Sequence, residues 1–154
     1  QSTGEALGIG DSRAEALVES FRGAGWNIPR RGTMLISVAD SAKPSAAPLA
    51  AMYNATGWKI EATEGTAAYL AKWGVKASLR GREDELLNAV GSDAWDLVVN
   101  VASSSPGALR FGYRMRRAAM EADIPCIHNL QVAAALGMAL AGGAASSPVK
   151  SGNV

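Results

Sequence analysis

The feature that most constrains the fold is an alternation of short apolar runs with helix-like segments, which begins at Thr33. The apolar runs are nearly continuous, as expected of strands that are buried on both faces of a parallel sheet. The expected strands are 33–38, 58–62, 75–79, 95–101 and 124–127, and the expected helices are 45–56, 65–73, 83–90, 109–122 and 130–140. This order predicts right-handed βαβ units, and therefore an α/β three-layer sandwich whose five-stranded parallel sheet is covered by helices on both faces.

The same pattern suggests how the chain is divided. Residues 1–31 are expected to form a helix, from Ser12 to about Arg22, and a linker, followed by the α/β domain at 32–141. Residues 142–154 are small and polar, so we expect them to be disordered. The chain starts with a polar stretch that lacks an initiator methionine, and we interpret it as a piece of a longer polypeptide.

Composition narrows the class of protein. The net charge is +1, which gives no electrostatic reason to expect nucleic acid or a membrane surface as a partner. No apolar run reaches the roughly 18 residues of a membrane span, and the N-terminus has no signal-peptide pattern. The one cysteine, Cys126, excludes an internal disulfide, and its apolar surroundings indicate a core residue rather than a nucleophile. We therefore expect a soluble cytoplasmic domain.

Four expected loops follow the carboxyl ends of strands, where parallel α/β sheets bind their ligands. They are 39–43, 63–66, 100–105 and 128–129. All four are rich in groups that hydrogen-bond an anion or a polar ligand. The sequence therefore predicts a ligand site at this edge of the sheet.

The segment from Thr63 to Thr66 is the strongest candidate at that edge. It opens an expected helix and combines two hydroxyl groups with Gly65, which permits close approach of a ligand to the backbone. Lys43, just past the first expected strand, is within reach of an anion held there, and Asp40 can orient it. The alternatives are that Thr63 only caps a helix, that Lys43 is an ordinary exposed lysine and that Asp40 is a turn residue.

Polar residues at the ends of the last two expected strands extend the candidate site. Asn100 ends the most convincing strand, and its amide can bond both a ligand and a neighbouring loop. Ser103 lies in the serine-rich loop that follows, and His128 and Asn129 come directly after the fifth strand. The alternatives are a plain serine-rich turn and a structural histidine.

A basic cluster is expected on the fourth helix of the α/β domain. Arg114 and Arg117 are three residues apart and share a helix face, whereas Arg116 points elsewhere. The cluster is compatible with a contact to the ligand loops or to a neighbouring domain. The alternative is a solvated helix face.

Together these segments resemble the methylglyoxal-synthase-like domain that ends the large chain of carbamoyl phosphate synthetases. The resemblance is carried by residues 32–38, Lys43, 57–66, 96–100, 112–119 and 124–129. Residues 2–8 also resemble the segment that ends the second synthetase unit, so the likeness covers about residues 2–141. It implies a methylglyoxal-synthase-like, Rossmann-like fold.

This family has an enzymatic branch and a regulatory branch. Methylglyoxal synthase removes a proton from dihydroxyacetone phosphate, which needs a carboxylate base with histidine and carboxylate partners. Where the enzyme's pattern has these groups, this chain has Ala39, the stretch 101–105, Ala108 and Phe111. The resemblance therefore implies that the chain has no catalytic residues, and methylglyoxal synthase is kept as an alternative.

The regulatory branch implies that the chain binds an anionic effector. The family's effectors are UMP and IMP in bacterial synthetases, UTP and phosphoribosyl pyrophosphate in the pyrimidine-pathway eukaryotes, and N-acetylglutamate in the urea-cycle form. Family ligand positions are matched here by Lys43, Thr63, Thr66 and Asn100. Arg80 or Arg82 stands in for a basic ligand on a longer loop, and Ala102 replaces a ligand threonine. Residues 102–105 do not match the asparagine-rich loop of the N-acetylglutamate form, which favours a phosphorylated, nucleotide-like effector.

The resemblance also implies a setting. The domain itself would hold no cofactor or metal, while the full enzyme would use ATP and Mg or Mn to make carbamoyl phosphate for pyrimidine or arginine biosynthesis. Its partners would be the rest of the large chain and a glutaminase subunit or domain. A further alternative is an interaction domain whose pocket has decayed.

Overall fold

The computed structural model describes residues 11–142. They form two compact units, of which the larger is Arg31–Leu130 and the smaller consists of the residues before and after it. The larger unit contains the whole sheet and every predicted ligand residue. The expected disordered tail is 142–154, and its residues 143–154 lie outside the described residues.

The sheet has five parallel strands in the order β3-β2-β1-β4-β5. The strands are β1 (Thr33–Val38), β2 (Lys59–Ala62), β3 (Ser78–Leu79), β4 (Leu97–Val101) and β5 (Cys126–Ile127). The central pair, β1 and β4, runs in register from Met34 opposite Leu97 to Val38 opposite Val101. The predicted α/β architecture with a parallel sheet is confirmed.

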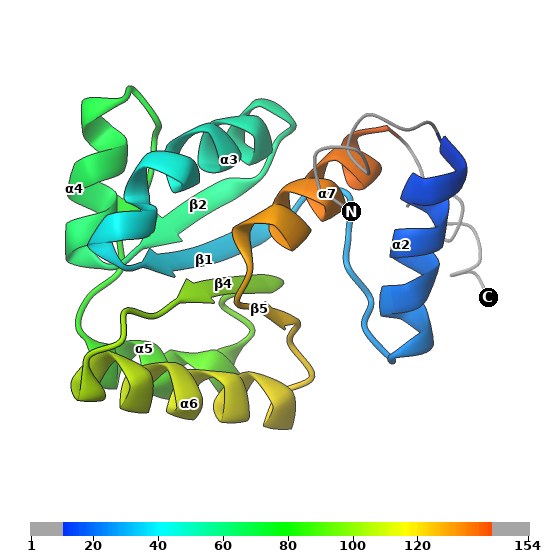
Figure 1. Ribbon diagram of the computed structural model, residues 1–154. Helices are drawn as coiled ribbons and strands as arrows, with labels where there is room; N and C mark the ends of the chain where they lie inside the picture. Colours follow the sequence, from blue (N-terminus) through cyan, green and yellow to red (C-terminus); the bar gives the residue numbers. More distant parts are fainter. Residues whose placement is uncertain (1–10, 143–154) are drawn as a thin grey trace. The chain divides into compact units, whose positions relative to one another are not determined.

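Helices α5 (Glu83–Ala89) and α6 (Pro106–Glu121) cover one face of the sheet (Figure 1). Leu35 of β1 and Val98 of β4 are register partners, so their side chains point to the same face. Both are fully buried in a cluster with Leu86, Val90, Trp95, Phe111, Met115, Ala119 and Ile124. Removal of this apolar surface from water, worth about 25 cal/mol per Å², fixes α5 and α6 against the sheet.

Helices α3 (Lys43–Ala55) and α4 (Glu64–Lys72) lie on the other face (Figure 1). Side chains alternate along a strand, so Met34 and Ile36 point to this side, and both are fully buried. Tyr53 of α3 is also fully buried and packs edge-on against Trp58, with ring centroids 5.5 Å apart. The sheet is therefore the middle layer of three.

The smaller unit contains α2 (Asp11–Gly23) and most of α7 (Leu130–Ala141). Just beyond α2, Trp26 stacks on Phe21 with ring centroids 5.4 Å apart. Helix α7 is almost entirely apolar and buries Leu136 and Leu140. No helix among residues 11–142 is long and apolar enough to cross a bilayer.

Some element boundaries differ from the sequence expectation. Helix α6 begins at Pro106, three residues before the expected Leu109. Ser105 caps it by accepting a hydrogen bond from the backbone N–H of Ala108, and proline suits the first turn because it lacks an N–H that would need a partner. Helix α3 begins at Lys43, so this lysine belongs to a helical first turn rather than to the preceding loop. Strands β3 and β5, at the two edges, are shorter than expected.

Candidate functional site

The candidate site is at the carboxyl ends of the strands, around β1. β2 lies on one side of β1 and β4 on the other, so the direction of strand order reverses at this point. Ligands of open parallel sheets bind at such a switch point. The predicted ligand loops therefore follow β1 and the strands next to this switch point.

A set of hydroxyl groups links the end of β1 to the start of α4. The hydroxyl of Thr63 lies 3.3 Å from that of Ser37 and 3.3 Å from that of Thr66. Thr66 is buried, and its Oγ1 accepts a hydrogen bond of 3.2 Å from the backbone N–H of Val38. These contacts hold the turn at Thr63 directly against β1.

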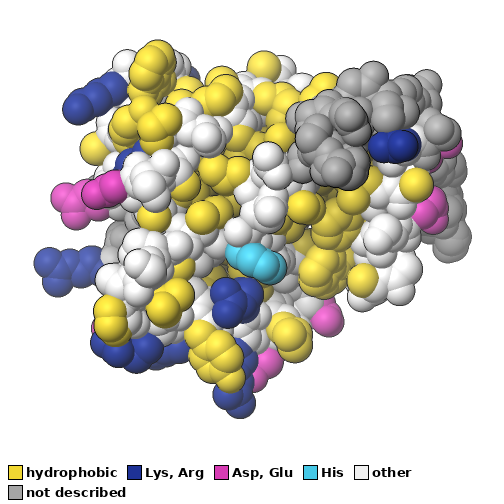
Figure 2. Space-filling model, viewed as in Figure 1, with side chains coloured by type: hydrophobic (Ala, Val, Ile, Leu, Met, Phe, Trp, Pro, Cys, Tyr) yellow, Lys and Arg dark blue, Asp and Glu magenta, His cyan; other side chains and the backbone are white. Residues whose placement is uncertain are grey.

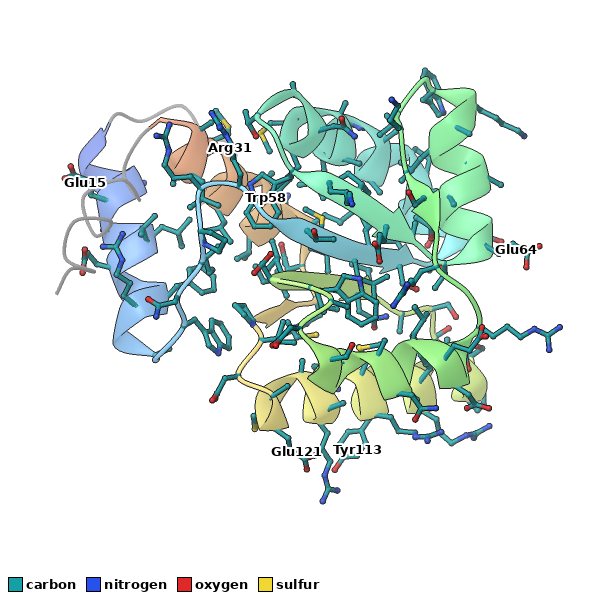
Figure 3. All side chains as sticks on the ribbon, turned by 180° about the vertical axis from the view of Figure 1, so that it is seen from behind. Glu15, Arg31, Trp58, Glu64, Tyr113 and Glu121 are labelled. Carbon is teal, nitrogen blue, oxygen red and sulfur yellow. The ribbon has the colours of Figure 1, made fainter. Side chains whose placement is uncertain are left out.

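The first turn of α4 contains backbone N–H groups that can donate hydrogen bonds to a ligand. The first N–H groups of a helix have no acceptor within it, and in α4 they belong to Glu64, Gly65 and Thr66. Thr63 occupies the N-cap position, but its side chain accepts no capping hydrogen bond. The exposed side chain of Glu64 points away from the sheet (Figure 3), so its charge is directed away from these donors. An anion at this turn would also gain from the helix dipole.

Lys43 brings a positive charge to the same place. A Cβ on Gly65 would lie 3.8 Å from Lys43 Nζ, so the ammonium group is next to the first turn of α4. It donates to the carbonyl oxygen of Val38 at 2.9 Å and to Asp40 Oδ1 at 2.7 Å. An ammonium group has three N–H donors, so one remains for a ligand. The Lys43 side chain is only 12% exposed, which means that its position is fixed by packing.

Asp40 is the acidic partner of this lysine. Its side chain is 99% exposed, and the hydrogen bond from Lys43, together with the charge of Lys43, lowers the pKa of its carboxyl group below its ordinary value. Asp40 is therefore ionised at neutral pH and is a weak base. Its negative charge opposes the binding of an anion at the first turn of α4, which contains Gly65.

Replacing Asp40 with Asn is expected to increase the affinity for inorganic phosphate several-fold at pH 7. The substitution removes a like charge from beside the anion and weakens the competition for Lys43. The hydrogen bond and the charge of Lys43 lower the pKa of the Asp40 carboxyl group, so the native residue keeps its negative charge at the pH of this measurement. The measurement is phosphate titration by calorimetry, with Asp93→Asn as a control for an exposed aspartate elsewhere. An unchanged or lower affinity in Asp40→Asn would contradict the electrostatic role.

Asn100 lies beside the hydroxyl cluster and is buried. It is the register partner of Ser37, so the two side chains are on the same face of the sheet, toward α6. Asn100 Oδ1 is buried and accepts no hydrogen bond from any residue in the described part of the chain. A Cβ at position 112 would lie 3.1 Å from this oxygen, so Gly112 leaves the room that Asn100 occupies. The same Cβ would lie 3.9 Å from Arg116 Nη1, so the guanidinium group of Arg116 lies on the side of α6 that faces Asn100.

The remaining polar candidates are arranged along the same edge. The Ser103 hydroxyl lies 3.1 Å from that of Ser105, the N-cap of α6. His128 and Asn129 follow β5 and are exposed. The register of Val99 with Ile127 places His128 level with Asn100. In Figure 2 the histidine lies next to basic side chains.

Arg80 follows β3, and its side chain contacts Glu61 and Trp95. Its Nε lies 3.6 Å from Glu61 Oε1, and its guanidinium group is 5.7 Å from the centre of the Trp95 ring. The Trp95 indole N–H donates to the same Glu61 oxygen at 2.8 Å. Arg80 therefore lies just beyond β3, with its backbone N–H bonded to Ala62 and its charge paired with Glu61.

Several of the predicted site residues lie together around the turn at Thr63. Lys43, Gly65, Thr63 and Thr66 are brought into one cluster, and Asn100 is its neighbour through Ser37. Ser37 and Gly112 were not predicted. Ser37 had a signal, since it is the one polar residue inside the apolar run of β1, whereas Gly112 had none until α6 was placed on Asn100.

The described residues offer little else for chemistry. No group of three or more His, Cys, Asp or Glu residues among them is arranged to hold a metal ion. Burial raises the pKa of the Cys126 thiol to about 11, so this cysteine is a poor nucleophile at neutral pH. A cavity of about 420 Å³ lies between α5 and α6 beside Ile124, which precedes β5, and it contains none of the predicted ligand residues.

Comparison with known proteins identifies the family. A model described as "MGS-like domain" matches residues 45–128, more than half of the chain. The chain belongs to the MGS-like domain family. The carbamoyl phosphate synthase large chain of Thermomicrobium roseum is 38% identical to it over 156 aligned residues, which cover 97% of this chain. The chain spans only 14% of that relative's length.

A solved structure shows the same fold. The crystal structure of methylglyoxal synthase from Elizabethkingia anophelis matches 69% of this chain and 76% of the enzyme, with a TM-score of 0.56. The two sequences are 16% identical, so the likeness concerns the fold alone. In this MGS-like domain, Ala39 donates its backbone N–H to Val101, and Phe111 is buried in the core. Neither position carries a group that can transfer a proton.

Proposed function

We propose that this MGS-like domain binds a phosphorylated, anionic effector and regulates a carbamoyl phosphate synthetase of which it forms part. The observation that carries the proposal is the cluster of Lys43 Nζ, the Gly65 turn and the hydroxyl groups of Thr63 and Thr66 at the carboxyl end of β1. It combines one fixed positive charge with several hydrogen-bond donors. That is the chemistry of a phosphate site.

In the proposed complex the phosphate group occupies the first turn of α4. The backbone N–H groups of Gly65 and Thr66 donate to its oxygens, and Lys43 donates its third N–H. Asn100 and Ser103 bind the next part of the effector, since they follow on the same edge. His128, Asn129 and Arg80 lie at the two sides and interact with a larger effector.

Regulation requires that the bound effector alter contacts between the domain and the rest of the large chain. Coupling of this kind typically changes an affinity by about 5- to 150-fold. The full protein would use ATP and a divalent cation in the cytoplasm, with a glutaminase partner, to supply pyrimidine or arginine biosynthesis. These properties belong to the proposal and follow from the likeness to a synthetase large chain.

Isothermal calorimetry of the chain with UMP, IMP, UTP, phosphoribosyl pyrophosphate and N-acetylglutamate tests the proposal. We expect at least one phosphorylated compound to bind at micromolar to millimolar concentration and N-acetylglutamate, which has no phosphate, to bind more weakly. If none of the five binds at millimolar concentration, the effector role is wrong and the domain acts through protein contacts alone.

The same preparation can be tested for the enzymatic alternative. Incubation with dihydroxyacetone phosphate is expected to give no methylglyoxal above the buffer control. The reason is that Asp40, the carboxylate beside the cluster, has a lowered pKa and pairs with Lys43, so it is a weak base for a carbon-bound proton. Sustained formation of methylglyoxal would establish the lyase activity and contradict the proposal.

A further inference from the structure

The outer face of α6 carries exposed hydrophobic side chains. Leu109, Tyr113 and Met120 are 53%, 59% and 73% exposed. They are four and seven residues apart, so they form one stripe along the helix. The Tyr113 side chain points away from the body of the unit (Figure 3). Half of the six exposed large hydrophobic residues in the described part of the chain lie on this one helix.

A basic stripe runs beside the hydrophobic one. Arg110, Arg114 and Arg117 are spaced by four and three residues and are all exposed. Helix α6 contains four arginines and one glutamate, a net charge of +3, while the whole chain has a net charge of +1. Figure 2 shows hydrophobic and basic side chains side by side over this helix. Tyrosine and arginine are the residue types that dominate binding energy at protein interfaces.

We propose that this face of α6 docks on an acidic, partly apolar surface of the remaining large chain. The inference rests on the proposed function, because it names the partner through which the effector site acts. Charge complementarity favours a negatively charged partner surface, since Arg110 and Arg114 attract carboxylates, while Arg117 pairs with Glu121 of the same helix at 3.5 Å. The large-chain relative supplies the candidate, because this chain spans only 14% of its length.

Two other occupants fit the surface less well. In a two-fold symmetric pair both copies contribute the same patch, so the interface would gather the +3 charge of both α6 helices. A nucleic acid fits less well because its binding needs many phosphate contacts, whereas this stripe offers three exposed arginines, of which Arg117 already pairs with Glu121. An acidic protein surface is compatible with both the charge of α6 and the exposed aromatic ring.

Helix α6 also connects this surface to the effector site. Its Gly112 lies against Asn100, and its N-cap, Ser105, contacts Ser103. The inner face of the helix thus contacts candidate effector residues, while the outer face presents Tyr113 and Arg114. A shift of α6 on effector binding would move the docking surface directly.

Hydroxyl-radical footprinting measures the predicted burial. In the full-length large chain, oxidation of Tyr113 and Met120 is expected to be several-fold slower than in the isolated chain. Trp73, which is 65% exposed on the far layer of the sandwich, is the internal control and is expected to be oxidised equally in both. Equal oxidation of Tyr113 and Met120 in the two samples would overturn the proposal. So would protection in the isolated chain that increases with its concentration, because that result indicates a second copy.

A double substitution tests the functional link in the full-length protein. Tyr113→Ala/Arg114→Glu is expected to reduce the effector-induced change to less than about twofold, while effector affinity of the isolated chain stays within about twofold of the unaltered value. The matched control, Lys72→Glu/Trp73→Ala, changes the exposed cation that ends α4 and the exposed aromatic residue that follows it, and is expected to keep the effector response. Full regulation in the α6 variant would contradict the proposal. Absence of effector binding to the unaltered isolated chain would instead refute the proposed function, and footprinting still tests the docking surface.

Discussion

Replacing Lys43 with Met is expected to weaken the binding of a phosphorylated effector by roughly 10- to 150-fold. A hydrogen bond that involves a charged group contributes about 1.5–3 kcal/mol, and each 1.4 kcal/mol is a factor of ten. Lys43 Nζ is the fixed positive charge next to the Gly65 turn, and its side chain is only 12% exposed, so solvent screening is limited. Methionine keeps the length of the aliphatic stem and removes the charge.

Calorimetry with UMP or inorganic phosphate measures this effect. Lys72→Met on α4 serves as the control, because Lys72 is exposed and lies at the opposite end of that helix from Gly65. Thermal unfolding of both variants separates a binding defect from a folding defect, since Lys43 also donates to the carbonyl of Val38. A Lys43→Met variant that folds normally and binds phosphate with unchanged affinity would remove Lys43 from the site.

Replacing Asn100 with Leu is expected to raise the free energy of unfolding by about 1–3 kcal/mol and to weaken effector binding. Asn100 Oδ1 is buried without a hydrogen bond, and a buried unsatisfied polar group costs about that much. Leucine has nearly the same branched shape and no polar atom. The loss of one neutral hydrogen bond to the effector corresponds to a roughly two- to twelvefold lower affinity.

Urea denaturation and calorimetry on the same samples measure the two effects. Asn88→Leu, an exposed position on α5, is the matched control and is expected to change stability by less than about 0.5 kcal/mol. A destabilised Asn100→Leu variant would mean that the space left by Gly112 is too small for leucine. Unchanged effector affinity would show that Asn100 does not contact the ligand. A variant that is more stable but binds the effector more weakly would indicate that Asn100 serves binding at the expense of stability.

Much of the fold was predictable because its signals are local. The apolar runs 33–38 and 95–101 correspond to β1 and β4, since strands buried on both faces require continuous apolar sequence. The start of α6 was misplaced although Ser105 and Pro106 carried a capping signal. The edge strands β3 and β5 were predicted too long, because their pairing depends on one neighbour only and ends where that neighbour's register ends.

The candidate site was predictable in its place but not in its contacts. Parallel strands bring their carboxyl ends to one edge, so the loops after β1 and β2 had to converge. Nothing in the sequence shows that Lys43 reaches the carbonyl of Val38, or that Arg80 packs against Trp95 and pairs with Glu61. Those contacts depend on side-chain directions, which are set only when the helices pack on the sheet.

The sequence by itself determined the layer order, the sheet edge that carries the candidate site and the residue types at the turn from Thr63 to Thr66. These follow from hydrophobic periodicity and from the handedness of βαβ units, which are local rules. Only the tertiary structure decided which residues meet. It brought Ser37 beside Thr63 and Asn100 against Gly112, and it left Tyr113 and the arginines of α6 exposed. The physical reason is that such contacts join residues far apart in the chain, so they exist only after the whole core has packed.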